Sequence, residues 1–330
     1  MSPEEVIRDY QTLGGIAQNI KVERGRYGYG IFPKVANTSI KIVTPAKLLI
    51  STSHLVLDRN HQIRIREGSG LDQKVIEFFE RYQQFLGWGK ESLSELSEYH
   101  LALTQLPKKI REYMLILGWS SADFSKKGPV DFLEEYCISR QIKIGDDSKI
   151  MPMLDLINHS SSGRAYTTHN GVSIEGVFKG EVLACYHNRS DAFHFYKNYR
   201  IISPSDIVLS CDTKINLPGG GALKISRADS VVTKNGKNFL PVTKRKGEEL
   251  QFAFVQLSQR KGDVAAKKVF VSQLEKLNVS ESIAVRVFDG LVSHNRRILT
   301  DLLNECASCN NKIAKQLESI TSSQLRLIES

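Results

Sequence analysis

The feature that most constrains this chain is the stretch from Ile150 to Asp206, and above all its opening, Pro152-Met153-Leu154-Asp155-Leu156-Ile157-Asn158-His159-Ser160. Here an acid, an amide and an imidazole stand within five positions of one another, directly beside an apolar run. Polar groups next to buried surface need hydrogen-bond partners. The fold must therefore bring other polar groups to this segment, and its spacing suggests chemistry as well as packing.

Before this stretch, the apolar pattern indicates strands and then helices. Apolar residues alternate with polar ones at Ile20 and Val22, and again at Ile40 and Ile42, as in half-buried strands. A helical stripe follows, which we interpret as core: Leu71, Val75, Phe78, Phe79, Tyr82 and Phe85. We expect a second helix from Ser92 to Leu106, stopped by Pro107, and a third that starts at Asp131 with Glu134 as its capping-box partner. The segment of about 65–140 is thus predicted to be helical.

After this segment, strand character returns at Val172, Ile174 and Val177, with a turn at Lys179-Gly180-Glu181. Further strand-like runs follow Asp206, and from Gly262 to the end the apolar spacing is helical. The fold class expected is therefore α+β.

A glycine-rich loop, Arg24-Gly25-Arg26-Tyr27-Gly28-Tyr29-Gly30, lies between the first two predicted strands. Glycines allow the backbone to approach a ligand closely and to adopt positive φ. A Gly-x-Gly by itself indicates no more than a tight turn, so its meaning depends on the other motifs.

Together, these residues resemble the motifs of SET-domain methyltransferases, in the branch related to the Rubisco large-subunit lysine methyltransferase. Asp155-x-x-Asn158-His159 matches the Asp-x-x-Asn-His signature, and Ser139-Arg140 matches the Ser-Arg pair shortly before it. The other matching segments are Gly28-Tyr29-Gly30-Ile31-Phe32, Val43-Thr44-Pro45, Lys179-Gly180-Glu181 with Cys185-Tyr186, and Ser190-Asp191-Ala192 in place of Ser-Asn-Ala. The motifs keep the family's order from Lys21 to about Asp206, whereas the remainder matches loosely.

The resemblance implies a split SET β-fold with a helical insert at about 65–140 and a mostly helical C-terminal lobe. It places the SET domain at 1–206 and a substrate-binding lobe at 207–330. It implies an S-adenosylmethionine-dependent protein methyltransferase that acts on a lysine side chain. The residues implied to bind or support the cofactor are Gly28, Tyr29, Gly30, Arg140, Asp155, Asn158 and His159. Among them, Arg140 would lie near the cofactor carboxylate, and Asp155 would buttress the segment.

The implied catalytic tyrosines are Tyr186 and Tyr199. In the family, the second tyrosine follows the Asn of Ser-Asn-Ala by seven positions, and Asn198 stands seven positions after Asp191. In the family, the substrate lysine enters through a channel that tyrosines line. Either a one-residue irregularity of the helix brings Tyr199 into such a channel, or the tyrosine has become Asn198. We assign Asn198 and Arg200 to substrate binding, and Arg200 favours an acidic peptide.

Two rival functions remain open at this stage. The first is a SET-like protein- or peptide-binding module that has lost catalysis, which Asn198 would favour. The second is nucleic-acid binding, suggested only by the net charge of +9 and a pI near 9.2. The most basic stretch, from Lys234 to Lys246, carries the single aromatic Phe239, a poor base-stacking platform. Nucleic acid is therefore an unlikely partner, and histidine stays open as the methyl acceptor.

Composition limits the remaining classes. No apolar run approaches the ~18 residues that a membrane helix needs, and Met1 to Glu5 lack the basic start of a secretory signal. Five scattered cysteines suit a reducing, intracellular compartment, such as the cytoplasm, a nucleus or an organelle. Cys306 and Cys309 have metal-like spacing, but no second such pair completes a zinc site, so no metal is expected. The sequence leaves the oligomeric state open.

Overall fold

The computed structural model describes residues 2–25, 28–88, 90–186, 190–203, 205–217, 221–227, 242–247, 249–258 and 265–329. Its helices and strands confirm the mixed α+β class. The chain forms two compact units, residues 1–98 with 127–188 and residues 99–126 with 189–330. We expected a boundary at 206, whereas the second unit begins at 189 and also takes in 99–126 of the predicted insert.

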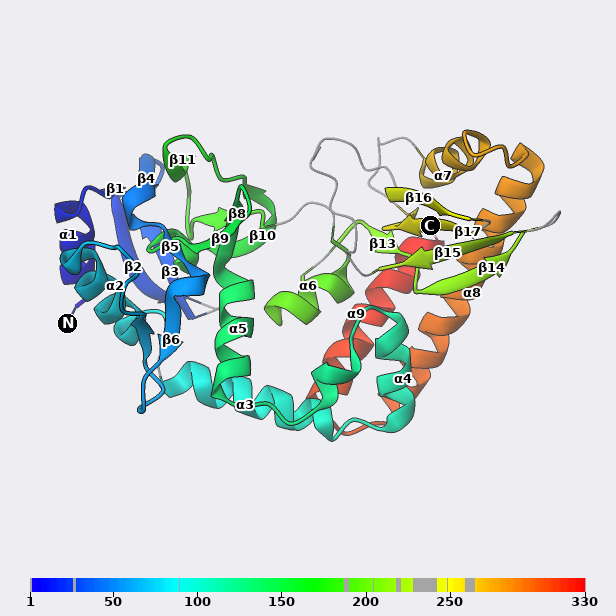
Figure 1. Cartoon of the computed structure of the whole chain (residues 1–330), viewed down its shortest axis with the longest axis horizontal. Helices are drawn as coiled ribbons and strands as arrows, with labels where there is room; N and C mark the ends of the chain where they lie inside the picture. The colour runs from blue at the N-terminus through cyan, green and yellow to red at the C-terminus, as the bar shows by residue number, and fades with distance from the viewer. Residues whose placement is uncertain are drawn as a thin grey trace. The chain divides into compact units, whose positions relative to one another are not determined.

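Small sheets and helices make up the first unit (Figure 1). Its strands are β1 (Ile16–Gln18), β2 (Ile20–Gly25), β3 (Gly28–Pro33), β4 (Ser39–Pro45), β5 (Ile50–Ser51), β6 (Leu55–Leu57), β7 (Ile63–Ile65), β8 (Gln141–Ile144), β9 (Asp147–Ile150), β10 (Asn158–Arg164), β11 (Gly171–Val177) and β12 (Leu183–Ala184). Its helices are α1 (Pro3–Thr12), α2 (Gln73–Phe85) and α5 (Pro129–Arg140), with short turns η1 (Ala46–Leu48), η2 (Thr52–His54) and η4 (Leu154–Leu156). The unit boundary falls within α3 (Lys90–Thr104).

The core of the first unit follows the periodicity of the sequence. In the sheet β1-β4-β11, buried Ile42 pairs with Ala17 on one side and with Ile174 on the other. The stripe on α2 is buried at Val75, Phe78, Phe79 and Tyr82, as predicted, and half-buried at Leu71 and Phe85. Alternation and helical spacing were sufficient to predict these buried residues, because each strand or helix turns one face to the core.

Two helix boundaries differ from expectation. α5 begins at Pro129, and the Asp131 carboxylate accepts the N–H of Gly128 at 2.7 Å, so Asp131 lies inside the first turn and does not start the helix. α3 ends at Thr104 and not at Leu106, and Pro107 precedes a further helix of the segment predicted to be helical, α4 (Lys108–Ile116). A proline ends one helix and suits the start of the next because its fixed φ is helical and it lacks an N–H.

The second unit combines a sheet with helices. Its strands are β13 (Val208–Leu209), β14 (Thr213–Asn216), β15 (Ala222–Ser226), β16 (Val242–Lys246), β17 (Glu249–Ala253) and β18 (Gln256–Ser258). Its helices are α4, α6 (Ala192–Tyr199), α7 (Ala266–Glu275), α8 (Glu281–Ala307) and α9 (Lys312–Glu329), with the turn η3 (Ser121–Phe124). The lobe after 206 is helical only from Ala266, because a sheet of order β14-β15-β17-β16 comes first.

The sheet of the second unit packs against α7 and α8 (Figure 1). Its buried side chains Leu223 and Phe252 share one cluster with Phe270 and Phe288. A second cluster joins α4, α6, α8 and α9 through Met114, Tyr196, Leu302, Leu317 and others. Among the described helices, none has the length and apolar character that crossing a membrane requires.

Candidate functional site

A strained turn organises the polar centre of the first unit. Met153 is fully buried and has φ 72° and ψ −45°, a conformation that costs a non-glycine residue of order 1–3 kcal/mol. Its N–H donates to the hydroxyl oxygen of Tyr82 at 3.2 Å, and that hydroxyl donates to the carboxylate of Asp155. Tyr82, which we expected only to fill the core, therefore holds both ends of the turn.

Asp155 is only 7% exposed. Its Oδ1 accepts from Tyr82, whereas its buried Oδ2 has no hydrogen-bond partner among the described residues. Burial raises the pKa of Asp155 to about 6, against the opposing effect of the Arg140 charge. A buried carboxylate with one unsatisfied oxygen can accept a hydrogen bond from a bound ligand.

Arg140, the last residue of α5, lies next to this turn. Its Nη1 donates to the backbone carbonyl of Asp155 at 2.8 Å, and its guanidinium lies 4.9 Å above the ring centre of Tyr136. No acceptor among the described residues takes its remaining N–H groups. A guanidinium has several donors in a planar fork that suits a carboxylate. Arg140 is thus held in position by one hydrogen bond, and its other N–H groups can donate to a ligand.

The next two motif residues open β10, which runs parallel to β12 with Asn158 opposite Leu183 and His159 opposite Ala184. The Asn158 amide donates to Oε1 of Glu181 at 2.5 Å. His159 is buried, and its Nδ1 accepts the N–H of Tyr186 at 3.3 Å. Burial lowers the pKa of His159 and keeps the ring neutral, although a hydrogen bond with the Ala184 backbone acts in the opposite direction.

Tyr186 lies beside this histidine, with ring centres 5.2 Å apart. Its hydroxyl donates to the backbone carbonyl of Ile157. Tyr186 is therefore adjacent to the Asn-His pair, although its place in a channel stays a prediction.

The glycine loop forms the β2–β3 hairpin, in which Gly25 pairs with Gly28 and Glu23 with Gly30. Gly28 has φ 94°, and a Cβ there would meet no atom of the described residues within 4 Å. At Gly30, by contrast, a Cβ would lie 2.4 Å from Oε1 of Glu181 and 3.2 Å from Nδ2 of Asn158. The hairpin and the Asn-His segment therefore meet at Gly30.

Two parts of the loop need separate mention. Tyr29 is half-buried, and the guanidinium of Arg24 lies 5.3 Å from its ring centre. Arg26 and Tyr27 lie outside the described residues, as do Lys234, Lys237 and Phe239 of the predicted basic loop.

Sequence reasoning missed two polar contributors, Tyr82 and Glu181. Tyr82 carried no signal because its helical spacing is that of a core residue. Glu181 did carry one, since it belongs to the Lys-Gly-Glu motif, but it was read as part of a turn.

The other predicted site residues belong to the second unit and lie at the end of α6. Tyr199 is half-buried with its ring centre 5.4 Å from that of Phe195, and Arg200 is a left-handed cap with its guanidinium 5.6 Å from the ring centre of Tyr99. The helix is regular from Ala192 to Tyr199, so the irregularity that we considered is absent. Half-buried Asn198 and Tyr199 therefore point in directions about 100° apart.

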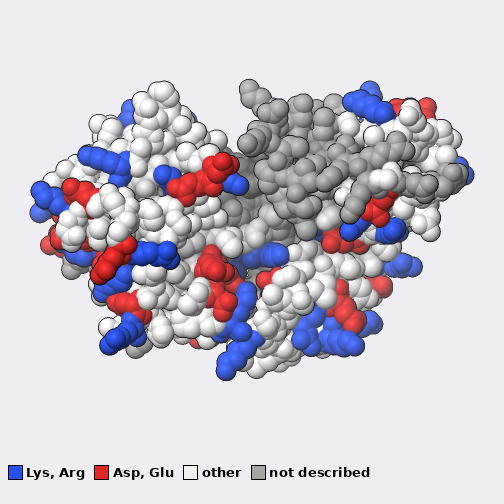
Figure 2. Space-filling view, viewed as in Figure 1, with Lys and Arg blue, Asp and Glu red and all other residues white. Residues whose placement is uncertain are grey.

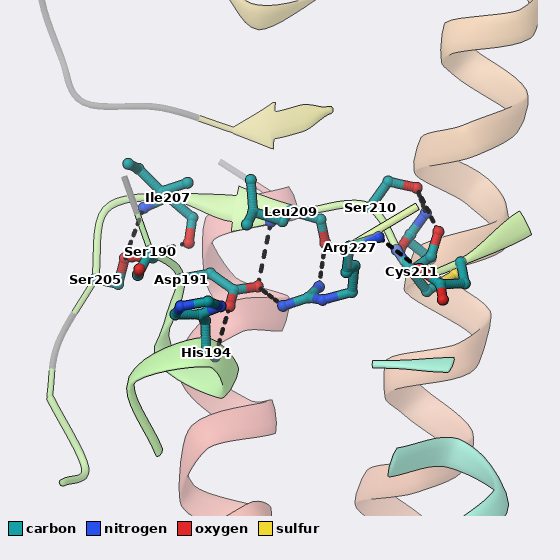
Figure 3. A network of polar contacts seen from close by, with 11 residues as sticks. Ser190, Asp191, His194, Ser205, Ile207, Leu209, Ser210, Cys211 and Arg227 are labelled. Carbon is teal, nitrogen blue, oxygen red and sulfur yellow. Dashed lines mark hydrogen bonds and ion pairs between the residues drawn. The ribbon is translucent and has the colours of Figure 1, made fainter. Parts of the chain in front are cut away.

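A buried ion pair fixes the start of α6 (Figure 3). Asp191 caps the helix by accepting the N–H of His194 at 3.0 Å, and its Oδ2 accepts from Nη2 of Arg227 at 2.5 Å. Arg227 also donates to the carbonyl of Leu209 at 2.8 Å. The carboxylate that replaces the family's Asn thus has a partner of opposite charge.

Within the described part of the chain, no three His, Cys, Asp or Glu side chains gather as metal ligands would. Cys306 is buried in α8, and Cys309 lies just beyond its end. Burial raises the pKa of Cys306 to about 12, so its thiol is protonated at neutral pH.

Comparisons with known proteins find likenesses only among solved structures. No protein-family model matches the chain, and neither does any curated protein sequence. Among solved structures, it is similar to Rubisco LSMT bound to sinefungin and monomethyllysine, with 14% identity, a TM-score of 0.45, and coverage of 99% of this chain and 89% of that one. It is also similar to Rubisco LSMT bound to AdoMet, with 14% identity, a TM-score of 0.43, and coverage of 99% and 88%. A third similar structure is the SET domain of LSMT bound to lysine and AdoHcy, with 12% identity, a TM-score of 0.41, and coverage of 99% and 89%. We transfer no residue role from these structures.

Proposed function

We propose that the protein is an S-adenosylmethionine-dependent methyltransferase that modifies a lysine side chain of a protein substrate. One observation carries the proposal: four kinds of group gather around the turn at Met153. They are the spare donors of Arg140, the unsatisfied carboxylate oxygen of Asp155, the amide of Asn158 and the hairpin at Gly28 and Gly30.

These residues fit the cofactor by charge and shape. Its amino-acid part carries a carboxylate, for which Arg140 supplies a fixed cation, and hydrogen-bonding groups, for which Asn158 and the Asp155 oxygen are available. Gly28 leaves its side of the hairpin open to close approach. The neutral, buried ring of His159 suits the adenine side of the molecule better than a charged one would.

When bound, S-adenosylmethionine supplies an activated methyl group. The chain's own task is to position the acceptor and to exclude water. A lysine near its ordinary pKa of about 10.4 is charged at neutral pH, and burial favours the neutral amine that can accept a methyl group. We assign Tyr186 to the lining of this acceptor site. For the family's second tyrosine we keep Tyr199, with Asn198 as the alternative. Burial raises the pKa of Tyr199, which keeps its hydroxyl protonated.

The described part of one face of the molecule carries charges of both signs (Figure 2). Basic and acidic side chains are interspersed over the face shown in Figure 2, and no field of one sign dominates its described part. Strong binding to the phosphate backbone would require such a field. Arg200 remains our candidate for selecting an acidic peptide.

A second candidate function is a binding module without catalysis. The regular α6 favours it, because Asn198 then keeps the register position of the family's tyrosine. Transfer of radiolabel from S-adenosylmethionine to proteins of a source lysate would decide between the two. Acid hydrolysis of the labelled product would identify methyl-lysine or methyl-histidine.

Cofactor binding can be tested directly by calorimetry. Asn158→Ala should weaken binding of S-adenosylmethionine by about 1–3 kcal/mol, because it leaves polar groups unpaired. Asn60→Ala, at an exposed position of the same unit, should leave binding unchanged. A wild-type protein that fails to bind millimolar cofactor would refute the proposed function.

A further inference from the structure

Glu181 is a half-buried carboxylate whose charge has no partner in the described part of the chain. Its Oε1 accepts the hydrogen bond from Asn158 at 2.5 Å, and no lysine, arginine or histidine among the described residues pairs with it. The next residue anchors it, since the N–H of Val182 donates to the carbonyl of Ile31 on β3 at 2.7 Å. Carboxylates removed from water usually have a cation or several donors nearby.

The carboxylate of Glu181 lies close to two glycines of the β2–β3 hairpin, Gly30 and Gly25. Its Oε1 lies 2.4 Å from the place of a Cβ at Gly30, and its Oε2 lies 3.4 Å from the place of one at Gly25. A side chain at Gly30 would displace the carboxylate. Glycine at position 30 therefore leaves the space that the Glu181 carboxylate occupies.

We propose, on the basis of the proposed function, that Glu181 binds the α-ammonium group of the cofactor's amino-acid part. Arg140, fixed by the backbone of Asp155, offers the positive charge for the carboxylate of the same part. Asn158 connects Glu181 with the turn that holds Arg140, because it follows this turn in the chain and donates a hydrogen bond to Glu181. One negative and one positive side chain then select a zwitterion over a ligand with a single charge.

A purely space-filling role of Glu181 would have the opposite effect on cofactor affinity. If Glu181 only fills the space above Gly30, a ligand must displace it, and removal of its charge would leave affinity unchanged or increase it. The two roles can therefore be separated by the sign of the effect and by the ligand that shows it.

The experiment measures dissociation constants by calorimetry for S-adenosylhomocysteine and for its analogue in which hydrogen replaces the amino group. Glu181→Gln keeps the shape and the acceptor for Asn158 but removes the charge. It should weaken S-adenosylhomocysteine binding about tenfold to a hundredfold, the usual range for a hydrogen bond to a charged group. Binding of the des-amino analogue should stay within about twofold. Glu175→Gln, at an exposed acid on β11, is the matched control.

The other outcomes are informative. Equal effects on both ligands, or tighter binding by Glu181→Gln, would overturn the inference. If Glu181→Gln does not fold, as judged by thermal unfolding, the wild type still tests it, since equal affinity for the two ligands would overturn it. Failure of the wild type to bind either ligand would instead refute the proposed function.

Discussion

Asp155 shows how a single residue can combine structural support with a proposed ligand contact. Its backbone carbonyl fixes Arg140, and its carboxylate takes the hydroxyl of Tyr82 that stabilises the strained Met153. Burial raises its pKa to about 6 in spite of the Arg140 charge, so the folded protein favours its protonated form more than the unfolded chain does. The site thus contains an acid whose ionisation opposes folding.

This acid should leave a signature in the pH dependence of stability. Because its folded pKa lies above the ordinary value of 3.8, its stabilising contribution is complete below that value and is lost as pH rises through about 6. Compared with Asp155→Asn, the wild type should lose about 2–3 kcal/mol of unfolding free energy between pH 4 and pH 7. Urea denaturation at several pH values measures this difference. His159 acts in the opposite direction, because its lowered pKa destabilises the fold as pH falls. This effect cancels when the unfolding free energy of Asp155→Asn is subtracted from that of the wild type at each pH. Parallel pH profiles of the two proteins would contradict it.

At the scale of elements, α6 shows how an ion pair can position a helix. Both partners are nearly inaccessible, with the side chain of Arg227 4% exposed and that of Asp191 0%. Asp191 also accepts the N–H of Leu209 at 3.3 Å, so one carboxylate joins the start of α6 to β13 and to the residue after β15. The charge introduced by Asp191 is thereby neutralised within the second unit.

Removal of Arg227 should be costly because a buried charge is left alone. Arg227→Met should destabilise the protein by about 3–5 kcal/mol, whereas Asp191→Asn with Arg227→Met should recover much of that loss. Arg286→Met, at an exposed position of α8, is the control. Denaturant unfolding of the wild type, Arg227→Met, Asp191→Asn and the double variant gives the coupling free energy, and strictly additive effects would show that the two residues do not act as a pair.

The regular end of α6 also separates two assignments of the catalytic residue. If Tyr199 contacts the acceptor, Tyr199→Phe should slow single-turnover methylation at least tenfold while cofactor affinity is retained, since one transition-state contact is lost. Asn198→Ala should then have a smaller effect. If Asn198 stands in the tyrosine's place, Tyr199→Phe should be silent and Asn198→Tyr should raise activity. A silent Tyr199→Phe in an active enzyme would therefore overturn our assignment.

At the scale of the whole molecule, each unit is assembled from separate parts of the chain. α4 belongs to the second unit, where Ile110, Met114 and Trp119 share a cluster with Leu302 and Leu317. A boundary at 206 would therefore leave α4 without its apolar partners.

A fragment of residues 1–206 tests this consequence. It should bind a hydrophobic dye strongly and self-associate, because the buried face of α4 has lost α8 and α9. Dye fluorescence and size-exclusion chromatography against the full chain measure both effects. A monomeric fragment that unfolds cooperatively without binding the dye would show that the first 206 residues form an independent domain.

The sequence predicted those features that depend on local periodicity or on neighbouring residues. The stripe on α2, the alternation in β4 and the helical character of most of 65–140 follow from which side chains must be buried. Helix ends were less accurate, as at Asp131, because caps depend on single hydrogen bonds. Asp155, Asn158 and His159 could be identified as site candidates because they are polar residues next to an apolar run.

By itself, then, the sequence determined the strongly periodic elements, the glycine turn and the residues that needed polar partners, since these follow from the backbone geometry and solvation of each segment. Only the tertiary structure decided which partners they found. Tyr82 reaches Asp155 across 73 positions, Glu181 reaches Asn158 across 23, and Arg227 reaches Asp191 across 36. Such pairs depend on packing between distant segments, and no local pattern records that packing.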